Sequence, residues 1–166
     1  MLRTVAQQLE PLALAKGLHF LKQGDSSRQL LIDQFKKHKR SVLFGTDSFW
    51  EGVDIAGDAL RLVIIVKLPF KVPSEPLLQA VCEILDKAGK NSFMDYQVPQ
   101  AVMKFKQGFG RLIRTNTDRG CILCLDKRLL TKSYGKIFLK SLPPCQTLFG
   151  KNEEVCKAIK LITQLS

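Results

Sequence analysis

Leu62-Val63-Ile64-Ile65-Val66 is the run from which the architecture of this chain can be predicted. Five consecutive apolar residues leave no polar face for water, which is typical of a strand buried on both faces in a parallel sheet. We expect this strand to continue to Leu68, and two further strands at Ser41–Phe44 and Cys121–Leu125. Helical patterns separate these runs, and the alternation predicts an α/β fold with a parallel sheet flanked by helices.

The expected helices lie between these strands and at both ends of the chain. Apolar spacing and turn residues predict helices over about residues 2–15, 75–88, 99–114, 129–141 and 153–165, with a short strand over 18–21 and a loop over 91–96. Ser26 or Ser27 is expected to cap a further helix, whose apolar face is Leu30, Leu31 and Phe35. A length of 166 residues fits a single domain with its own core.

The charge balance favours a polyanionic partner. Lysine and arginine number 26 against 15 acidic residues, which gives a net charge of +11. Such an excess attracts nucleic acid or an anionic membrane surface, although a solvated basic face is the alternative interpretation. The run Lys36–Arg40 ends a predicted helix, where cations suit the negative end of the helix dipole, so this run needs no functional explanation.

Cysteine usage indicates a reducing compartment. The five cysteines are an odd number, and the N-terminus has no apolar core typical of a secretion signal, so we expect a cytoplasmic protein. The longest apolar run, Leu62–Val66, is too short to span a bilayer, and we expect no membrane partner. Cys121 and Cys124 have the C-x-x-C spacing but lie in a predicted strand, where residues three apart face opposite ways. We therefore predict no metal site.

The segment Gly45–Asp54 follows directly on a predicted strand. In open α/β sheets, ligands collect beyond the carboxyl ends of the strands. Thr46 and Ser48 offer hydroxyl groups to a phosphate, and Asp54 offers a carboxylate to a ribose hydroxyl. The alternative interpretation is a polar turn whose Asp and Gly residues serve turn geometry alone.

A second polar segment lies in the helix predicted to end at Arg114. On that helix, an apolar stripe faces the core, whereas Gln107, Arg111 and Arg114 share the opposite side at offsets of four and three. Guanidinium groups match phosphate oxygens. Gly108 and Gly110 each cost about 1 kcal/mol inside a helix relative to alanine, which suggests that something approaches the backbone closely. A solvated basic face is again the alternative. The stripe consists of Val102, Phe105, Phe109, Leu112 and Ile113.

Together the two segments resemble motifs V and VI of superfamily-two helicases. The residues Thr46-Asp47 and Gly52-Val53-Asp54 resemble motif V, and Gln107-x-x-Gly110-Arg111-x-x-Arg114 resembles motif VI. Further segments are similar to the DinG branch of the DinG/XPD helicase family, and the resemblance extends over about residues 18–144. These segments are Ser48–Asp54, Leu68–Phe70 with Pro73, Pro99–Ala101, Lys106–Arg114, Asp126–Arg128 and Tyr134–Lys136.

The resemblance implies a RecA-like domain, the second of two motor domains that enclose ATP. The motif VI arginines then reach the triphosphate, which assigns a catalytic role to Arg111 and Arg114. Gln107 takes the place of the first polar residue of motif VI. Gly110 is then expected beside the nucleotide.

The motif V resemblance adds contacts on both ligands. Gly52 and Asp54 match positions near the nucleotide, and Thr46 and Ser48 match the stretch that contacts the nucleic-acid backbone. The implied activity is 5′ to 3′ unwinding of single-stranded or forked DNA, driven by hydrolysis of ATP with Mg²⁺. The iron–sulfur cluster of some family members belongs to the first motor domain, so none of the five cysteines inherits that role.

The sequence departs from a complete motor in one respect. It contains no G-x-x-x-x-G-K-[ST] phosphate loop and no Asp-Glu-x-His box. We therefore expect a first motor domain supplied in cis or by a split gene. The first strand expected of this domain, before residue 2, is also missing, so we expect a sheet truncated at its N-terminal edge. Two alternatives remain open at this stage: a stand-alone nucleic-acid-binding module, and a decayed helicase remnant without catalysis.

Overall fold

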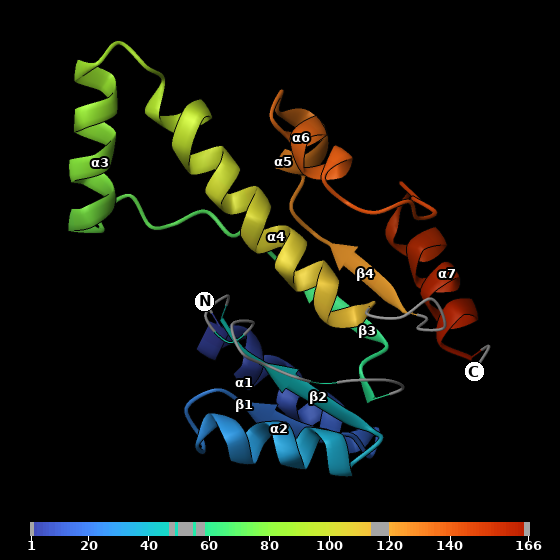
Figure 1. Ribbon diagram of the computed structural model, residues 1–166. Coiled ribbons are helices and arrows are strands. Elements are labelled where there is room, and N and C mark those ends of the chain that lie inside the picture. Colours follow the sequence, from blue (N-terminus) through green and yellow to red (C-terminus); the bar gives the residue numbers. More distant parts are fainter. Residues whose placement is uncertain (1, 47–48, 50–54, 56–58, 114–119, 165–166) are drawn as a thin grey trace. The chain divides into compact units, whose positions relative to one another are not determined.

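The computed structural model describes residues 2–46, 49, 55, 59–113 and 120–164. By its internal contacts the chain divides into two compact units, Met1–Leu60 and Arg61–Ser166. Each unit contains one pair of parallel strands covered by helices (Figure 1). The class is therefore the predicted one, a mixed helix and strand fold with parallel sheets, consistent with a RecA-like helicase domain.

The first unit alternates helix and strand. Its elements are α1 (Leu2–Ala15), β1 (His19–Lys22), α2 (Arg28–Lys37) and β2 (Ser41–Phe44). The two strands pair in parallel from His19 opposite Ser41 to Lys22 opposite Phe44. Gly17 ends α1 with a φ of 66°, a left-handed conformation that favours glycine. Both α1 and α2 pack against this strand pair.

Helix α2 begins as predicted and buries a slightly different face. Ser27 is the N-cap, and its hydroxyl accepts a hydrogen bond from the Leu30 amide at 3.3 Å. Leu30 is 47% exposed, so its assignment to the core was wrong. Ile32 takes that place because it lies beside Leu31 and one turn from Phe35. The core cluster of the unit consists of Leu31, Ile32, Phe35, Phe49 and Ile55.

The second unit holds the remaining elements. In chain order they are β3 (Leu62–Ile65), α3 (Pro76–Lys87), the π-helical segment η3 (Phe93–Gln97), α4 (Val98–Leu112), β4 (Cys121–Cys124), α5 (Arg128–Thr131), α6 (Gly135–Lys140) and α7 (Asn152–Gln164). Strands β3 and β4 pair in parallel from Leu62 opposite Cys121 to Ile65 opposite Cys124. Helix α3 contributes one fully buried residue, Leu78, and lies away from the strands (Figure 1).

An aromatic cluster packs several segments of the second unit together. Phe70 stacks on Phe93 with ring centroids 5.6 Å apart and meets the edge of Tyr134 at 5.5 Å. Phe138 is fully buried and contacts Phe105 of α4 at 5.4 Å. The cluster therefore joins the loop after β3 to α4 and α6, and it accounts for two of the family-like segments, Leu68–Phe70 and Tyr134–Lys136, by packing.

Four predicted elements differ from the structure. The strand from Leu62 ends at Ile65 rather than Leu68. The loop expected over 91–96 is mostly the π-helical segment that leads into α4. The helix expected over 129–141 is two short helices, with a break before Gly135. Helix α4 ends at Leu112, and Ile113 is extended with φ −116° and ψ 113°, so the helix does not reach Arg114.

None of the described helices has both the length and the apolar character that a bilayer crossing requires.

Candidate functional site

The carboxyl-terminal turns of α4 carry three of the predicted site residues. Gln107 and Gly110 are exposed, and Arg111 is half-buried. Gln107 and Arg111 are four residues apart on the helix, so their side chains lie on the same side, as predicted. A Cβ atom at Gly110 would meet no atom of the described residues within 4 Å beyond its chain neighbours and the backbone of its own helix. The helix surface beside Arg111 is therefore open.

Arg111 has a feature that its neighbours lack. Its Nε atom is buried and has no hydrogen-bond partner among the residues that the structure describes. A buried donor on a charged group is costly to leave unpaired, by more than the roughly 1–3 kcal/mol typical of neutral groups. Such an orphaned donor is a reason to look for a missing acceptor. A phosphate oxygen would suit it, because guanidinium–phosphate hydrogen bonds are charge-assisted.

The two glycines of α4 serve different purposes. Gly108 is buried on the core side of the helix, one turn from Phe105 and from Leu112. Gly108 therefore faces the interior of the protein rather than an external ligand. The predicted stripe is corrected accordingly: the fully buried positions are Val98, Ala101, Phe105, Gly108 and Leu112. Val102, Phe109 and Ile113 are only half-buried.

Arg114 lies outside the described residues. Its predicted position on one helix face with Arg111 depended on a helix that continues past Ile113. Because α4 ends at Leu112, that geometric argument no longer holds. The end of α4 is packed closely, since a Cβ atom at Gly120 would lie 2.6 Å from Cγ of Leu112.

Thr46, the predicted nucleic-acid contact, lies at the carboxyl end of β2. Its amide donates to Gln23 Oε1 at 2.8 Å, and its hydroxyl lies 3.0 Å from the same oxygen. Gln23 follows β1 directly, and its own amide donates to the Phe44 carbonyl at 2.8 Å. The parallel pairing thus brings together the two residues that leave neighbouring strands. Sequence reasoning missed Gln23, although its position after a strand was the available signal.

Phe49, three residues after Thr46, lies in the core of the first unit. Phe49 is 6% exposed, and a Cβ atom at Gly45 would lie 2.9 Å from its Cβ. Arg28 holds the same residue by donating to the Phe49 carbonyl at 2.8 Å, with its guanidinium carbon 5.4 Å from the ring centroid. Sequence reasoning missed Arg28 as well, and no motif marks it. The other predicted residues here, Ser48, Gly52 and Asp54, lie outside the described residues.

An ion pair between Asp126 and Arg128 lies at the carboxyl end of the strand pair in the second unit. Arg128 Nη2 lies 2.6 Å from Asp126 Oδ2, and the same carboxylate oxygen accepts from the Leu68 amide at 2.9 Å. The hydrogen bonds from Arg128, assisted by that from Leu68, lower the pKa of Asp126 to about 2. Arg128 also lies over the Phe70 ring at 5.4 Å. The pair therefore ties the residues after β4 to those after β3.

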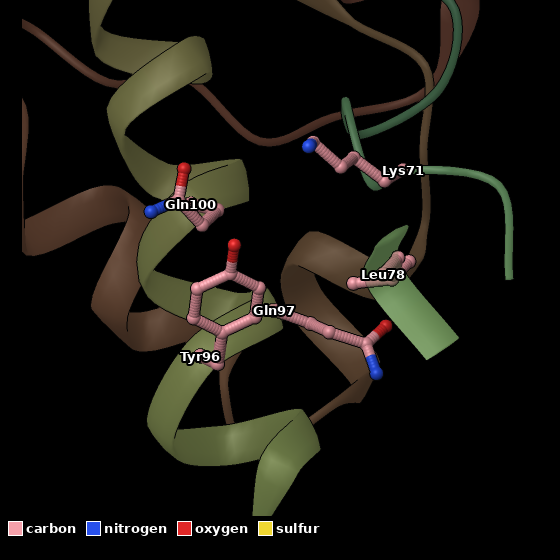
Figure 2. Close-up of a pocket in the computed structure, with 5 residues that line it drawn as sticks. All are labelled: Lys71, Leu78, Tyr96, Gln97 and Gln100. Atoms are coloured by element: carbon pink, nitrogen blue, oxygen red, sulfur yellow. The ribbon is translucent and has the colours of Figure 1, made fainter. Parts of the chain in front are cut away.

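A small hollow lies beside this part of the second unit. Figure 2 shows its lining, which comes from the loop after β3, α3, η3 and α4: Lys71, Leu78, Tyr96, Gln97 and Gln100. It has room for no more than about one water molecule. The hollow is therefore too small for a nucleotide, and the surface at Gly110 and Arg111 remains the candidate for a phosphate ligand.

Comparison with known proteins gives a consistent family. The family model described as helicase C-terminal domain matches residues 1–145, which span both units. The ATP-dependent DNA helicase YoaA of Haemophilus influenzae is 55% identical over 126 residues, covering 76% of this chain and 20% of that protein. The ATP-dependent DNA helicase YoaA of Escherichia coli is 41% identical over 162 residues, covering 98% and 24%.

A third relative is named for a different activity. The 3′-5′ exonuclease DinG of Bacillus subtilis is 46% identical over 145 residues, covering 86% of this chain and 16% of that protein. The chain thus spans between 16% and 24% of the length of these three curated relatives.

Proposed function

The chain belongs to the family of helicase C-terminal domains, and on that premise we propose that it is the second motor domain of an ATP-dependent DNA helicase. In this proposal the complete motor unwinds single-stranded or forked DNA in the 5′ to 3′ direction in the cytoplasm. The observation that carries the proposal is the buried, unpartnered Nε of Arg111 beside the open surface at Gly110.

The residues at the end of α4 fit a nucleotide triphosphate. Arg111 supplies an unsatisfied, charged donor, and Gly110 leaves room for a ligand to approach the backbone. Gln107 adds an exposed amide on the same side of the helix. We assign Arg114, Gly52 and Asp54 to the same nucleotide by their resemblance to helicase motifs. Mg²⁺ is held mainly by the first motor domain in this proposal.

The role of Arg111 follows from its surroundings. ATP supplies the phosphoryl group whose transfer to water drives movement. A guanidinium that is half-buried interacts more strongly with negative charge than one in water, because the local dielectric is lower. Arg111 is also preorganised, since its stem is fixed on a helix whose other face is core. It would therefore stabilise charge that develops on the phosphate oxygens.

Thr46 and Ser48 are proposed to contact the DNA backbone. Thr46 is held by Gln23 at the carboxyl end of two parallel strands, where ligands of α/β sheets commonly bind. Its hydroxyl and its amide are oriented by the same glutamine oxygen, so that part of the surface is defined before DNA arrives. Backbone contacts of this kind position nucleic acid without reading its sequence.

The test is substitution of the arginines in a protein that joins this chain to the preceding region of the Escherichia coli relative. Arg111→Ala or Arg114→Ala should lower DNA-stimulated ATP hydrolysis by about 10³-fold or more, as loss of an arginine finger does. Arg111→Lys should restore little, because an ammonium lacks the planar fork. Affinity for single-stranded DNA without nucleotide should stay within a few-fold.

Arg3→Ala is the matched control, because Arg3 is an exposed arginine on α1 outside the proposed site. Unchanged hydrolysis together with lost DNA binding in the Arg111 variant would move this arginine to the nucleic-acid surface. That result would also favour the stand-alone binding module over a motor domain.

A further inference from the structure

A run of five basic residues, Lys36–Arg40, joins α2 to β2. The helix dipole accounts for only part of it. Helix α2 ends at Lys37, and His38 is already extended with φ −104° and ψ 104°. The dipole effect falls off within the last turn of a helix, so it favours Lys36 and Lys37 but gives no reason for Lys39 and Arg40.

The fold adds further basic residues to this run. Arg40 Nη2 donates to the Lys16 carbonyl at 2.9 Å, and the His19 amide donates to the Arg40 carbonyl at 2.8 Å. The rings of His19 and His38 stack with centroids 3.9 Å apart and an interplanar angle of 26°. These contacts fix the end of α1 beside the start of β1 and β2. We call Lys16, Lys36, Lys37, Lys39 and Arg40 the basic edge.

The basic edge has little local counter-charge. Asp33 lies one helical turn before Lys36 and Lys37, but residues 11–24 and 34–46 contain no aspartate or glutamate. All five side chains of the edge are exposed, and none forms an ion pair with a described carboxylate. Five exposed cations gathered at one end of a strand pair create a positive potential that attracts a polyanion.

The basic edge is separate from the predicted DNA contact at Thr46. It lies at the amino-terminal end of β1 and β2, since His19 pairs with Ser41, whereas Gln23 and Thr46 follow the carboxyl ends. Four residues of strand rise about 13 Å at 3.3 Å each. The two ends of the strand pair therefore cannot contact the same phosphate group.

We propose that the basic edge is a second nucleic-acid-binding surface, which takes the phosphodiester backbone of a DNA segment other than the one at Thr46. Nucleic acid fits the four cations of residues 36–40 better than a membrane does, because none of these five residues is apolar, whereas interfacial membrane binding places apolar side chains beside the cations. Leu12 and Leu14 are exposed before Lys16, and the vesicle measurement below tests this alternative. Phosphate contacts by lysine and arginine are independent of sequence and strengthen as salt falls. This inference does not depend on the ATP site.

The test compares two triple variants of the full chain. Lys36→Gln, Lys37→Gln and Lys39→Gln remove three cations of the basic edge. Lys87→Gln, Lys90→Gln and Lys157→Gln remove three exposed lysines of the second unit. Both variants lower the net charge from +11 to +8, so any difference between them reports position rather than total charge. Arg40 is left in place because its side chain holds Lys16.

Binding is measured by fluorescence anisotropy with a labelled oligonucleotide, single-stranded and as duplex, over a range of salt. Each phosphate contact contributes about 0.7 to the slope of log K against log salt for single strands and about 0.9 for duplex. The basic-edge variant should therefore lose about 2 from this slope with single strands and nearly 3 with duplex, and the control variant should lose much less. A third variant with arginine at positions 36, 37 and 39 should keep the wild-type slope.

Three outcomes would overturn the proposal. The first is an equal loss of slope in the two glutamine variants, which would make binding a matter of net charge. The second is no measurable DNA binding by the wild-type chain at low salt. The third is a loss of binding to phosphatidylserine vesicles while DNA binding is unchanged, which would assign the surface to anionic lipid. Circular dichroism of each variant checks that the fold is retained.

Discussion

At the scale of single residues, Gly110 and Gly135 differ in whether packing within the protein requires a glycine. A Cβ atom at Gly110 would lie in open space on α4, whereas one at Gly135 would lie 2.6 Å from the carbonyl carbon of Leu129 and overlap its oxygen. Gly135 is thus required by the close approach of α5 and α6. Gly110 has no such internal reason, which supports an external ligand.

Replacing each glycine separately by alanine should therefore change the free energy of unfolding in opposite directions. Gly110→Ala should raise the free energy of unfolding by up to about 1 kcal/mol, because alanine is the better helix former. The same change should lower ATP hydrolysis in the joined two-domain protein. Gly135→Ala should destabilise by several kcal/mol through overpacking. Urea unfolding and phosphate release measure the two effects. A Gly110 variant that is both stabilised and fully active would remove the argument for a close ligand there.

Asp126 makes the stability of the second unit depend on pH. Its side chain is 7% exposed, and the bonds from Arg128 lower its pKa to about 2. A carboxylate with a lowered pKa stabilises the fold above its ordinary pKa, and this contribution is lost as pH falls towards the folded value. Asp126→Asn should cost about 1–3 kcal/mol at pH 7.

The difference in the free energy of unfolding between wild type and Asp126→Asn should then become smaller below about pH 4. Urea unfolding monitored by circular dichroism at a series of pH values measures it. Asp33→Asn is the control, because this exposed carboxylate accepts only a surface hydrogen bond from Gln29. A gap that stays constant from pH 7 to pH 3 would mean that the charge of Asp126 does not stabilise the fold.

At the scale of elements, apolar spacing and capping residues predicted the helices and strands that are regular. Helix α1 spans the predicted residues, Ser27 caps α2, and β2 spans Ser41–Phe44. These elements are encoded locally, by periodicity and by a hydroxyl at the right position. The extra turn at Phe93–Gln97 and the break before Gly135 are set by tertiary packing around the aromatic cluster. Periodicity carries no information about such contacts.

The candidate site was likewise predictable only where it depends on local spacing along the chain. Gln107, Gly110 and Arg111 could be placed on one helix from their spacing, because α4 is regular to Leu112. The unpaired Nε of Arg111 and the role of Gln23 depend on burial and on strand pairing. Burial and strand pairing depend on residues that are distant in sequence. Neither feature could therefore be predicted without the structure.

Helix α3 contributes one buried side chain to the second unit. Leu78 is 3% exposed, whereas Leu77 and Ile84 are 72% and 67% exposed. Leu78→Ala should therefore cost about 2–5 kcal/mol, within the range for buried leucine. Leu77→Ala and Ile84→Ala should change the free energy of unfolding by less than about 0.5 kcal/mol. Urea denaturation of the three variants compares them. Equal losses of stability in the three variants would indicate that the face of α3 carrying Leu77 and Ile84 is covered in solution.

At the scale of the whole molecule, the family match spans both compact units, so the helicase resemblance is not confined to either. The predicted site residues are distributed accordingly. Thr46 and the segment after it belong to the first unit, and the end of α4 belongs to the second. The single domain predicted from sequence remains a prediction, as does the contribution of a first motor domain.

The last prediction concerns catalysis by the chain as a whole. Its sequence has arginines that suit a triphosphate but no phosphate loop and no Asp-Glu-x-His box. The isolated chain should therefore show no DNA-stimulated ATP hydrolysis, because the lysine and acid that hold the phosphates and Mg²⁺ must come from another domain. Joining it to the preceding region of the Escherichia coli relative should produce hydrolysis, which Arg111→Ala should abolish.

Steady-state phosphate release with and without single-stranded DNA measures both proteins. The isolated chain is still expected to bind DNA weakly, so binding without turnover is the predicted state. Circular dichroism checks that the preparation is folded. Turnover by the isolated chain near 1 s⁻¹, at the low end of typical enzymes, would contradict the two-domain mechanism. In that case the phosphates would have to be held by residues of this chain alone, and the assignment of Arg111 as a contribution to a shared site would be wrong.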